Sequence, residues 1–415
     1  MNIEKKEGTM KILVTFIIFI FSVTVLASDL PSFIKRLDYY DQNAQGEITR
    51  ISHEKYRYVE GYAYLDLTFP NGKNPNISRP RMNEVLRYFD NKIIPINIDR
   101  FIPGYDTSEE NKIVILFDNI HDKKYYQNDP NKDYPAFFSK AFSQTYKKKI
   151  IIVDVNFATD DRIDLLLNHE LMHVFRYMHN KNEEPWLDEG ISKLIEYMIA
   201  GTDCIQLNNY QKNTNLELKY NYAIPSQVHY AHNLLYLIYL YNNYGGSKLL
   251  KKLIVSKKSG IENINSALRE TVKDEKSSFK KEYYSFEKTF VNFSLALLLN
   301  PYQETVGSEG LLTLDTSGVN RITHFSVLPE SIDFKNHYKI KPLASRHYQV
   351  DRKCVELAVS ENNLVVIAID LDNSNENEII RVLASGKICF KVERKSGQFI
   401  TVINPSNTSV TFQFN

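Results

Sequence analysis

The spacing of apolar and polar residues changes character near residue 110. Upstream of that point, GEITRISHEKYRYVEGYAYLDLTF (46–69) alternates in places, which predicts hairpin strands. The segment RPRMNEVLRYFDNKIIP (79–95) has helical spacing and predicts a short helix that stops before Pro95. We therefore expect residues 28–110 to form a mixed N-terminal region.

Residues 111–300 combine strand and helix patterns. NKIVILFDNI (111–120) and KKKIIIVDVNF (147–157) contain apolar runs of strand length, which predicts two buried strands. A helix is then predicted over residues 160–179, with the two aspartates that open it as capping residues. This order places a strand directly before a long apolar helix.

More helices follow along the chain. After a linker that ends with Pro185 and Trp186, a second helix is predicted over residues 188–200. A third covers residues 227–246, with Gly245 at a natural stop, and further helical patterns continue to about residue 300. The intervening segment, 201–226, is rich in asparagine and predicts a loop.

The last hundred residues change pattern again. PYQETVGSEG (301–310) has the composition of a linker, and short apolar alternations separated by turn residues fill residues 311–415. This pattern predicts a C-terminal all-β domain of the sandwich type. Together, the helix and strand patterns predict an α+β fold.

The N-terminus has the pattern of an export signal. Lys11 precedes an apolar run over residues 12–27 that ends in the short residues a signal peptidase requires, which predicts a signal peptide over residues 1–27. An uncleaved anchor is the alternative. The run is short for a membrane helix, and no later run reaches membrane length. We therefore expect an exported mature chain without a membrane span, either secreted, periplasmic or at the cell surface.

The chain has three cysteines, Cys204, Cys354 and Cys389. Exported proteins reach oxidising surroundings in which disulfides persist. Cys354 and Cys389 both lie in strand-like segments and could form a disulfide, and Cys204 would then have no cysteine to pair with. Three buried free thiols are the alternative.

The charge balance argues against a nucleic-acid partner. The sequence holds 51 basic and 50 acidic residues, a formal net charge of +1, and it has no long basic stripe. Nucleic-acid-binding proteins carry such a stripe or patch, so we do not expect this chain to bind nucleic acid.

The segment NHELMHVF contains His169-Glu170-x-x-His173 within the helix predicted at 160–179. Residues four apart lie on one helix face, so both imidazoles can point at one metal ion. Glu170 lies about 100° around the helix from His169, beside the metal and outside the ligand set. Zinc lowers the pKa of a bound water toward about 7, and a carboxylate there can act as general base. Because short motifs also match by chance, two ordinary helical histidines are the alternative.

A third ligand is expected from WLDEGIS (186–192). The 15 residues between His173 and Glu189 allow the chain to leave one helix and return as an antiparallel second helix, which brings the Glu189 carboxylate to the metal. Gly190 permits close helix approach. Asp188 is the competing ligand, or else a helix cap or a partner that orients a ligand.

Peptide hydrolysis also requires a group that stabilises the tetrahedral oxyanion. Tyr230 and His232, on the predicted third helix, are the candidates. Core packing is the alternative for Tyr230, because the chain has 27 tyrosines. We expect His179 and His229 to be surface or loop residues.

HELMHVF followed by WLDEGIS resembles the gluzincin zinc metallopeptidases, in which the glutamate of a W-L-x-E-G segment is the third ligand. The resemblance implies His169, His173 and Glu189 as zinc ligands and Glu170 as the base. The order of segments over about residues 85–300 is similar to that of the hyicolysin-type secreted bacterial metallopeptidases.

The sequence departs from the family pattern at several points. YDTSEEN (105–111) replaces the acidic, glycine-rich turn that would hold calcium, and no Gly-x-Met-Glu-Asn segment precedes the zinc helix, which argues against the aminopeptidase branch. The thermolysin branch has an aspartate four residues after the ligand glutamate, where this chain has Lys193. This substitution implies a different set of groups around the ligands.

These observations predict a secreted zinc metallopeptidase, an endopeptidase acting on protein or peptide substrates. Its zincin-like catalytic domain, a mixed sheet plus a helical subdomain, would span residues 111–300, and residues 28–110 would be part of that unit or a pro-segment. A non-catalytic surface or binding protein that retains the zincin scaffold is one alternative. A zinc hydrolase of non-peptide amides is another, because the same water attack serves both reactions.

Overall fold

The computed structural model divides the chain into two compact units, one built from residues up to 92 with 106–163 and one from 93–105 with 164–415. The chain mixes helices and sheets, which confirms the α+β prediction at that level. The predicted signal peptide, Cys204 and most of YDTSEEN lie outside the described residues. The described residues are 37–42, 48–53, 56–58, 64–66, 78–106, 113–118, 120, 135–140, 143–144, 147–200, 210–219, 227–274, 284–299, 327–359, 364–370, 378–383, 386–390 and 398–415.

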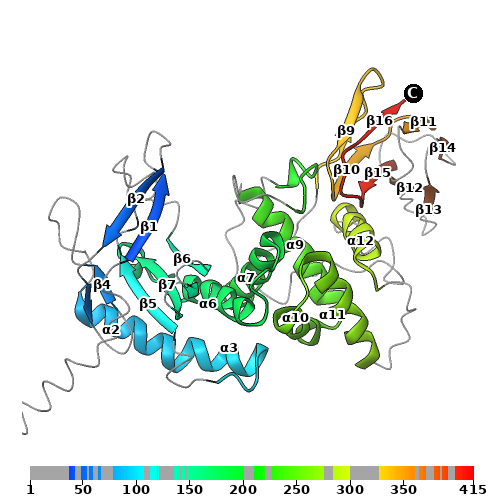
Figure 1. The fold of residues 1–415 in the computed structure, drawn as a ribbon. Helices are drawn as coiled ribbons and strands as arrows, with labels where there is room; N and C mark the ends of the chain where they lie inside the picture. Colours follow the sequence, from blue (N-terminus) through cyan, green and yellow to red (C-terminus); the bar gives the residue numbers. More distant parts are fainter. Residues whose placement is uncertain are drawn as a thin grey trace, which may run out of the picture. The chain divides into compact units, whose positions relative to one another are not determined.

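The first unit contains a mixed sheet with strand order β3-β4-β5-β7-β6 (Figure 1). Strands β4, β5 and β7 are parallel, and the outer strands β3 and β6 are antiparallel to their neighbours. A separate antiparallel hairpin pairs β1 with β2. The predicted hairpin strands and both predicted buried strands, β5 and β7, are therefore present. The bounds are β1 Leu37–Gln42, β2 Ile48–His53, β3 Tyr56–Tyr58, β4 Tyr64–Asp66, β5 Ile113–Asp118, β6 Ala136–Phe138 and β7 Lys149–Asp154.

The helix predicted to stop before Pro95 continues past it, so that prediction was wrong. Helix α2 (Arg79–Tyr88) is followed by a π-helical turn (Phe89–Ile93) and then by α3 (Ile94–Phe101). Pro95 lies in the first turn of α3, directly after the π-helical turn. The regular α-helical hydrogen-bond pattern is thus interrupted just before the proline, which has no N–H to donate.

The second unit holds the other long helices, at the positions that the apolar pattern predicts. Helix α7 begins at Pro185, three residues before the predicted start, because proline is well suited to the first helical position. Gly245, with a φ of 105°, separates α9 from α10 as expected of a helix stop. The bounds are α6 Ile163–His179, α7 Pro185–Ala200, α9 Gln227–Asn243, α10 Gly246–Val255, α11 Gly260–Asp274 and α12 Phe286–Leu299.

Helix α9 is central to the packing of this unit, since it contacts α7, α10 and α12 (Figure 1). Gly190 on α7 allows the close approach that the sequence suggested, and the neighbour is α9. A Cβ atom at Gly190 would lie 3.1 Å from Leu237 Cδ2 and 3.4 Å from Asn233 Cβ. A larger side chain at this position would therefore push apart the two helices.

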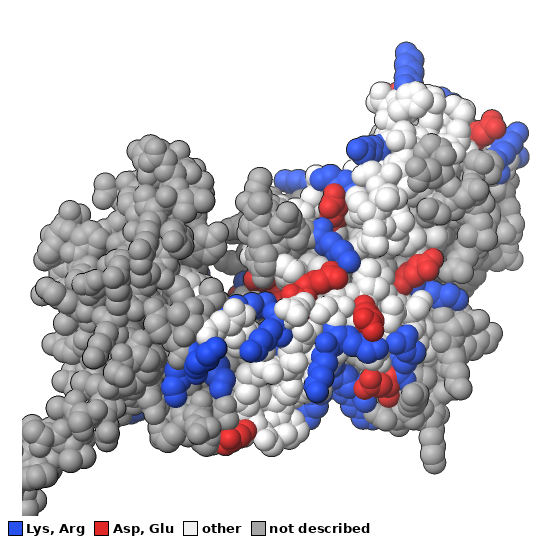
Figure 2. Space-filling model, viewed as in Figure 1, with Lys and Arg blue, Asp and Glu red and all other residues white. Residues whose placement is uncertain are grey.

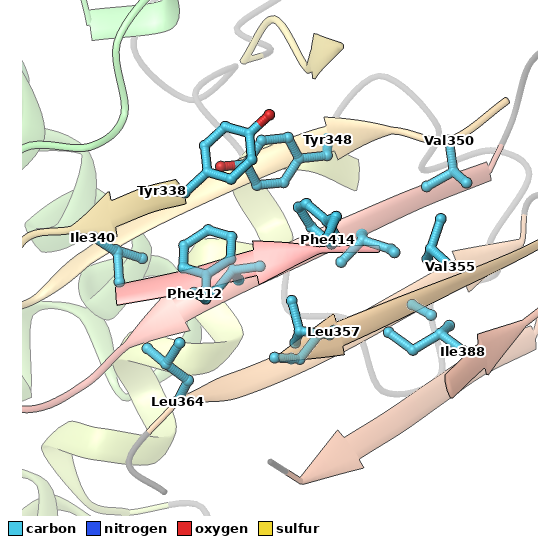
Figure 3. Close-up of a cluster of buried hydrophobic side chains, with 14 of the residues drawn as sticks. Tyr338, Ile340, Tyr348, Val350, Val355, Leu357, Leu364, Ile388, Phe412 and Phe414 are labelled. Carbon is cyan, nitrogen blue, oxygen red and sulfur yellow. The ribbon is translucent and has the colours of Figure 1, made fainter. Parts of the chain in front are cut away.

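The C-terminal strands form two sheets with the orders β13-β12-β15-β10-β8 and β14-β11-β16-β9. Both sheets contribute side chains to one apolar cluster, in which Val410, Phe412 and Phe414 of β16 alternate inward (Figure 3). This period-two burial explains why short alternating segments predicted strands. The bounds are β8 Glu330–Ser331, β9 His337–Ile340, β10 Ala344–Gln349, β11 Cys354–Val359, β12 Val365–Asp370, β13 Glu378–Leu383, β14 Gly386–Cys389, β15 Gln398–Asn404 and β16 Val410–Phe414.

The segment 210–219, between α7 and α9, is hydrogen-bonded to these sheets. Thr214 Oγ1 donates to the Ser345 carbonyl at 2.9 Å, and the Leu218 N–H donates to the Leu343 carbonyl at 3.1 Å. Helix α12 also contacts β15. The strands and the helices that carry the histidines thus belong to one compact unit.

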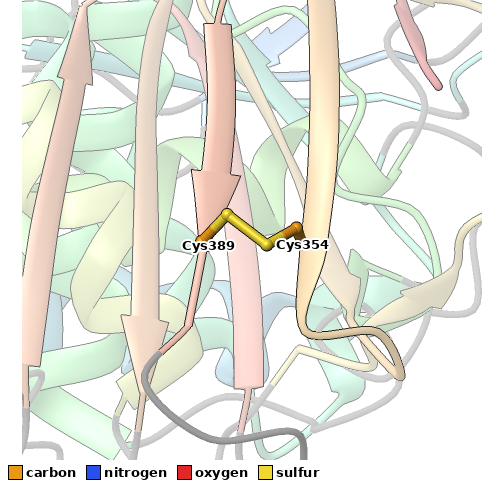
Figure 4. The surroundings of a disulfide bond; sticks show 2 residues. All are labelled: Cys354 and Cys389. Atoms are coloured by element: carbon orange, nitrogen blue, oxygen red, sulfur yellow. A yellow bond between two sulfur atoms is a disulfide. The ribbon is translucent and has the colours of Figure 1, made fainter.

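Cys354 and Cys389 form a disulfide between β11 and β14, where they are directly opposite each other in the strand register (Figure 4). The pairing interpretation of these two cysteines is therefore the one the structure supports. The bond encloses β12 and β13 in a loop of sequence separation 35.

Replacing both cysteines by serine should lower the free energy of unfolding of the oxidised chain by about 2–4 kcal/mol, because an unfolded chain without this long loop closure gains conformational entropy. Urea unfolding of the parent and the double variant measures the difference. Reduction of the parent should reproduce the effect and leave the variant unchanged. Equal unfolding midpoints in oxidised parent and variant would contradict the disulfide.

The described surface carries both signs of charge. Figure 2 shows basic and acidic side chains next to one another on the face drawn. Ion pairs such as Lys258–Glu262, at 3.0 Å, also join exposed side chains of opposite charge. Among the described helices, none is both long and apolar enough to cross a membrane.

Candidate metal centre

Helices α6 and α7 bring three metal-binding side chains together. His169 and His173 lie one turn apart on α6, and Glu189 lies on α7. The Nε2 atoms of the two histidines are 3.2 Å apart, and Glu189 Oε2 is 3.3 Å from His169 Nε2 and 3.7 Å from His173 Nε2. Both histidines are buried. The three residues predicted as ligands therefore converge on one point.

The donor triangle has the dimensions of a zinc site. A zinc ion bound tetrahedrally at about 2.0–2.1 Å separates its nitrogen and oxygen ligands by about 3.3 Å. The three observed separations lie close to this value. Two imidazoles and one carboxylate are also the donor types of catalytic zinc sites, which keep the fourth position for water. The group could thus hold a divalent metal ion.

The second nitrogen of each histidine contacts an acidic side chain of α7. Glu196 Oε2 lies 3.1 Å from His169 Nδ1, and Asp188 Oδ2 lies 3.2 Å from His173 Nδ1. Ser192 Oγ is 3.4 Å from the same nitrogen of His173. A carboxylate on the far nitrogen fixes the tautomer and the direction of a metal-binding imidazole. Asp188 is therefore placed to orient His173, outside the donor triangle.

The electrostatic surroundings favour a positive charge at the two imidazoles. Burial alone would lower the pKa of His173, but the negative charges of Asp188 and Glu189 raise it to about 10. Burial likewise acts to lower the pKa of His169, and its hydrogen bonds with Glu189 and Glu196 more than offset this. A bound cation could supply the same positive charge in place of the protons.

Glu170 is buried beside these groups. Its negative charge contributes to raising the pKa values of both histidines. The pKa of Glu189 is lowered overall. Burial would raise it, but the neighbouring His173 and His169 lower it by more. The Glu189 carboxylate is thus one of the three donors, and Glu170 directly follows the donor His169 in α6.

The turn between α6 and α7 is held by a buried ion pair. Arg176, one turn beyond His173 on α6, pairs with Glu183, and both side chains are almost fully buried. Glu183 also accepts hydrogen bonds from Asn263 Nδ2 at 2.8 Å and from the Gly260 N–H at 2.6 Å. This network fixes the path by which α7 returns to α6, and so fixes where Glu189 lies.

Trp186 anchors the start of α7. Its Nε1 donates to Glu184 Oε2 at 2.6 Å, and its ring packs edge-on against Phe286 of α12. The tryptophan of WLDEGIS is thus a structural anchor that places Glu189 one turn further along the helix.

The two oxyanion candidates, Tyr230 and His232, differ in their surroundings on α9. The Tyr230 ring lies with its centroid 5.9 Å from Lys193 Nζ. His232 is enclosed in the core, stacked between Tyr210 and Phe293, and burial lowers its pKa to about 3. A neutral, enclosed imidazole of this kind contributes to packing and is out of reach of a substrate.

The remaining histidines singled out in the sequence differ in setting. His179 is exposed in the last turn of α6, which agrees with a surface position. His229 is half-buried in the first turn of α9 and belongs to a helix, contrary to a loop position.

Sequence reasoning did not identify Glu196 or the Arg176–Glu183 pair. Glu196 follows Glu189 by seven residues, a spacing that places both on one helix face, and this was the available signal. The partners of Arg176 and Glu183 include residues about 80 positions away in the chain, and local patterns carry no information on such contacts.

No protein-family model matches the chain, and no curated protein matches it. Among solved structures, one similar chain is a family GH115 4-O-methyl-α-glucuronidase described as specific for decorated arabinogalactans, at 11% identity and a TM-score of 0.13. The match covers 66% of this chain and 47% of that one, so the chain spans about half the length of the glucuronidase. A TM-score this low carries no argument about fold or activity.

Proposed function

We propose that the chain is a zinc-dependent metallopeptidase of the gluzincin type, and an endopeptidase. The observation that carries the proposal is the convergence of His169 Nε2, His173 Nε2 and Glu189 Oε2 at tetrahedral-edge distances, with the buried Glu170 beside them. The motif His169-Glu170-x-x-His173 and the helix-return glutamate are the same residues on which the family resemblance rests.

Each side chain has a definite task in this proposal. A zinc ion held by the two histidines and Glu189 would lower the pKa of a water molecule and polarise a substrate carbonyl. Glu170 accepts the proton of the attacking water and later passes it to the leaving amine. Asp188 and Glu196 keep the imidazoles aimed, and Tyr230 is the candidate to stabilise the oxyanion.

The finer architecture belongs to the same proposal. The mixed sheet of the first unit together with helices α6, α7 and α9 supports a zincin-like catalytic domain made of a sheet part and a helical part. The two C-terminal sheets that share one apolar cluster support a β-sandwich. We assign the sandwich a stabilising role, because residues 210–219 bond to it next to the helices of the site.

Export is proposed on two grounds. The sequence carries the signal-peptide pattern over residues 1–27. The Cys354–Cys389 disulfide is of the kind that persists in oxidising compartments. The proposed location is therefore outside the cytoplasm: secreted, periplasmic or at the cell surface.

Incubation of the purified full chain with a reduced, alkylated protein should yield internal fragments, because an unfolded substrate presents many peptide bonds to an endopeptidase. A zinc chelator should stop the cleavage, and added zinc should restore it. Mass spectrometry of the fragments measures the cleavage and identifies the bonds. Cleavage that persists after complete removal of zinc would refute the proposal, and stoichiometric zinc without any cleavage would favour the binding-protein alternative.

A further inference from the structure

We propose that Glu196 positions the His169 imidazole for metal binding, and that Lys193 holds Glu196 in that role. The inference rests on the proposed zinc site and concerns the groups around it. It accounts for the departure from the family pattern at Lys193, where the thermolysin branch has an aspartate.

The geometry assigns the two nitrogens of His169 to different partners. Nε2 faces His173 and Glu189, while Nδ1 lies 3.1 Å from Glu196 Oε2. When Nδ1–H donates a hydrogen bond to this carboxylate, Nε2 of the neutral imidazole carries the lone pair that a metal needs. Glu196 therefore selects the tautomer of His169 and the direction of its ring.

Lys193 restrains this carboxylate from the other side. Its Nζ donates to the same Glu196 Oε2 at 2.6 Å, and both side chains are about four-fifths buried. Glu189, Lys193 and Glu196 follow one another at spacings of four and three residues, so they lie along one face of α7. A charge-assisted bond in these partly dry surroundings is stronger than an exposed surface pair.

Lys193 also connects this face to α9, because its ammonium lies 5.9 Å from the centroid of the Tyr230 ring. The order along α7 is thus metal ligand, lysine and positioning carboxylate. Glu196, three residues after Lys193, is the carboxylate of this helix face that contacts His169 Nδ1.

A test requires variants that separate positioning from simple helix stabilisation. Glu196→Gln removes the charge and keeps the shape, Lys193→Met removes the ammonium, and Lys193→Arg retains a positive charge. Glu262→Gln is the matched control. Glu262 of α11 forms an ion pair at 3.0 Å with Lys258, which precedes that helix, and both side chains are far more exposed to water than those of Lys193 and Glu196. Zinc affinity is measured by competition with a chelator, ligand geometry by the visible absorption of the cobalt-substituted chain, and stability by the thermal midpoint of the metal-free chain.

We expect Glu196→Gln to lower zinc affinity about 10–100-fold and to alter the cobalt spectrum. Lys193→Met should change both in the same direction and by less, Lys193→Arg should recover most of the parental values, and Glu262→Gln should match the parent. Parental zinc affinity and cobalt spectrum in Glu196→Gln, even with a lowered thermal midpoint, would overturn the positioning role and leave the proposed function intact. A parent chain that binds no zinc would overturn both.

Discussion

Replacing Glu170 by glutamine is expected to abolish peptide hydrolysis while zinc remains bound. The amide has nearly the size and shape of the carboxylate but cannot accept a proton from water, and general-base catalysis of this kind contributes about 10²–10⁴-fold to rate. The ligand atoms belong to His169, His173 and Glu189, which the substitution leaves in place. Fragment formation from an unfolded protein measures turnover, and elemental analysis measures zinc in the same preparations.

The comparison requires a glutamate whose charge has no part in the site. Glu262→Gln meets this need, because Glu262 is an exposed residue of α11 that pairs with Lys258. It should retain parental turnover and zinc content. If Glu170→Gln still hydrolyses the substrate at the parental rate, the base must be another group. If it loses zinc, Glu170 supports the ligands as well.

The sequence predicted those parts of the site that depend on local geometry. The spacing of His169 and His173 determines that both imidazoles face one side of α6, whatever surrounds the helix. Glu189 required one further step, that the chain returns after a turn. The family resemblance and the 15-residue gap supplied that step, and the structure places Glu189 against both histidines.

Contacts between distant segments could not be predicted in this way. Arg176 has the sequence context of an ordinary helix-end cation, and only the fold shows that it is buried against Glu183 and donates to the Ile254 and Ser256 carbonyls at the end of α10. For His232 the sequence suggested a role in the site, whereas the fold encloses its side chain in the core. It lies two residues from Tyr230 on the same helix, and a sequence cannot tell which side of α9 faces Tyr210 and Phe293.

The fold was predicted most accurately where burial follows a simple period. Strands β5 and β7 and the alternating strand β16 match their apolar patterns. Pro95 gave a false helix end, because a proline stops a helix from within but is tolerated at the start of the next one. The same tolerance explains why α7 starts at Pro185, earlier than predicted.

Replacing Glu189 by alanine should remove most of the zinc affinity. Zinc sites with four protein ligands bind with about 10–16 kcal/mol, so one ligand contributes about 2.5–4 kcal/mol, or a roughly 10²–10³-fold change in affinity. Loss of the carboxylate also removes a negative charge that favours a cation at His173. Competition with a chelator measures the dissociation constant, and circular dichroism of the metal-free chain verifies that the helices remain folded.

Asp188→Asn distinguishes the two acidic residues that compete for the ligand role. Asp188 contacts Nδ1 of His173, on the side of the ring away from Glu189, so its replacement leaves the three donor atoms in place. Removing such an orienting contact typically costs about 10–100-fold in metal affinity or activity, which is at or below the lower limit of the loss expected for a ligand. We therefore expect zinc to bind more weakly to Glu189→Ala than to Asp188→Asn. The opposite order would transfer the ligand role to Asp188, since a residue that only orients His173 cannot contribute more to zinc binding than a residue bonded to the metal.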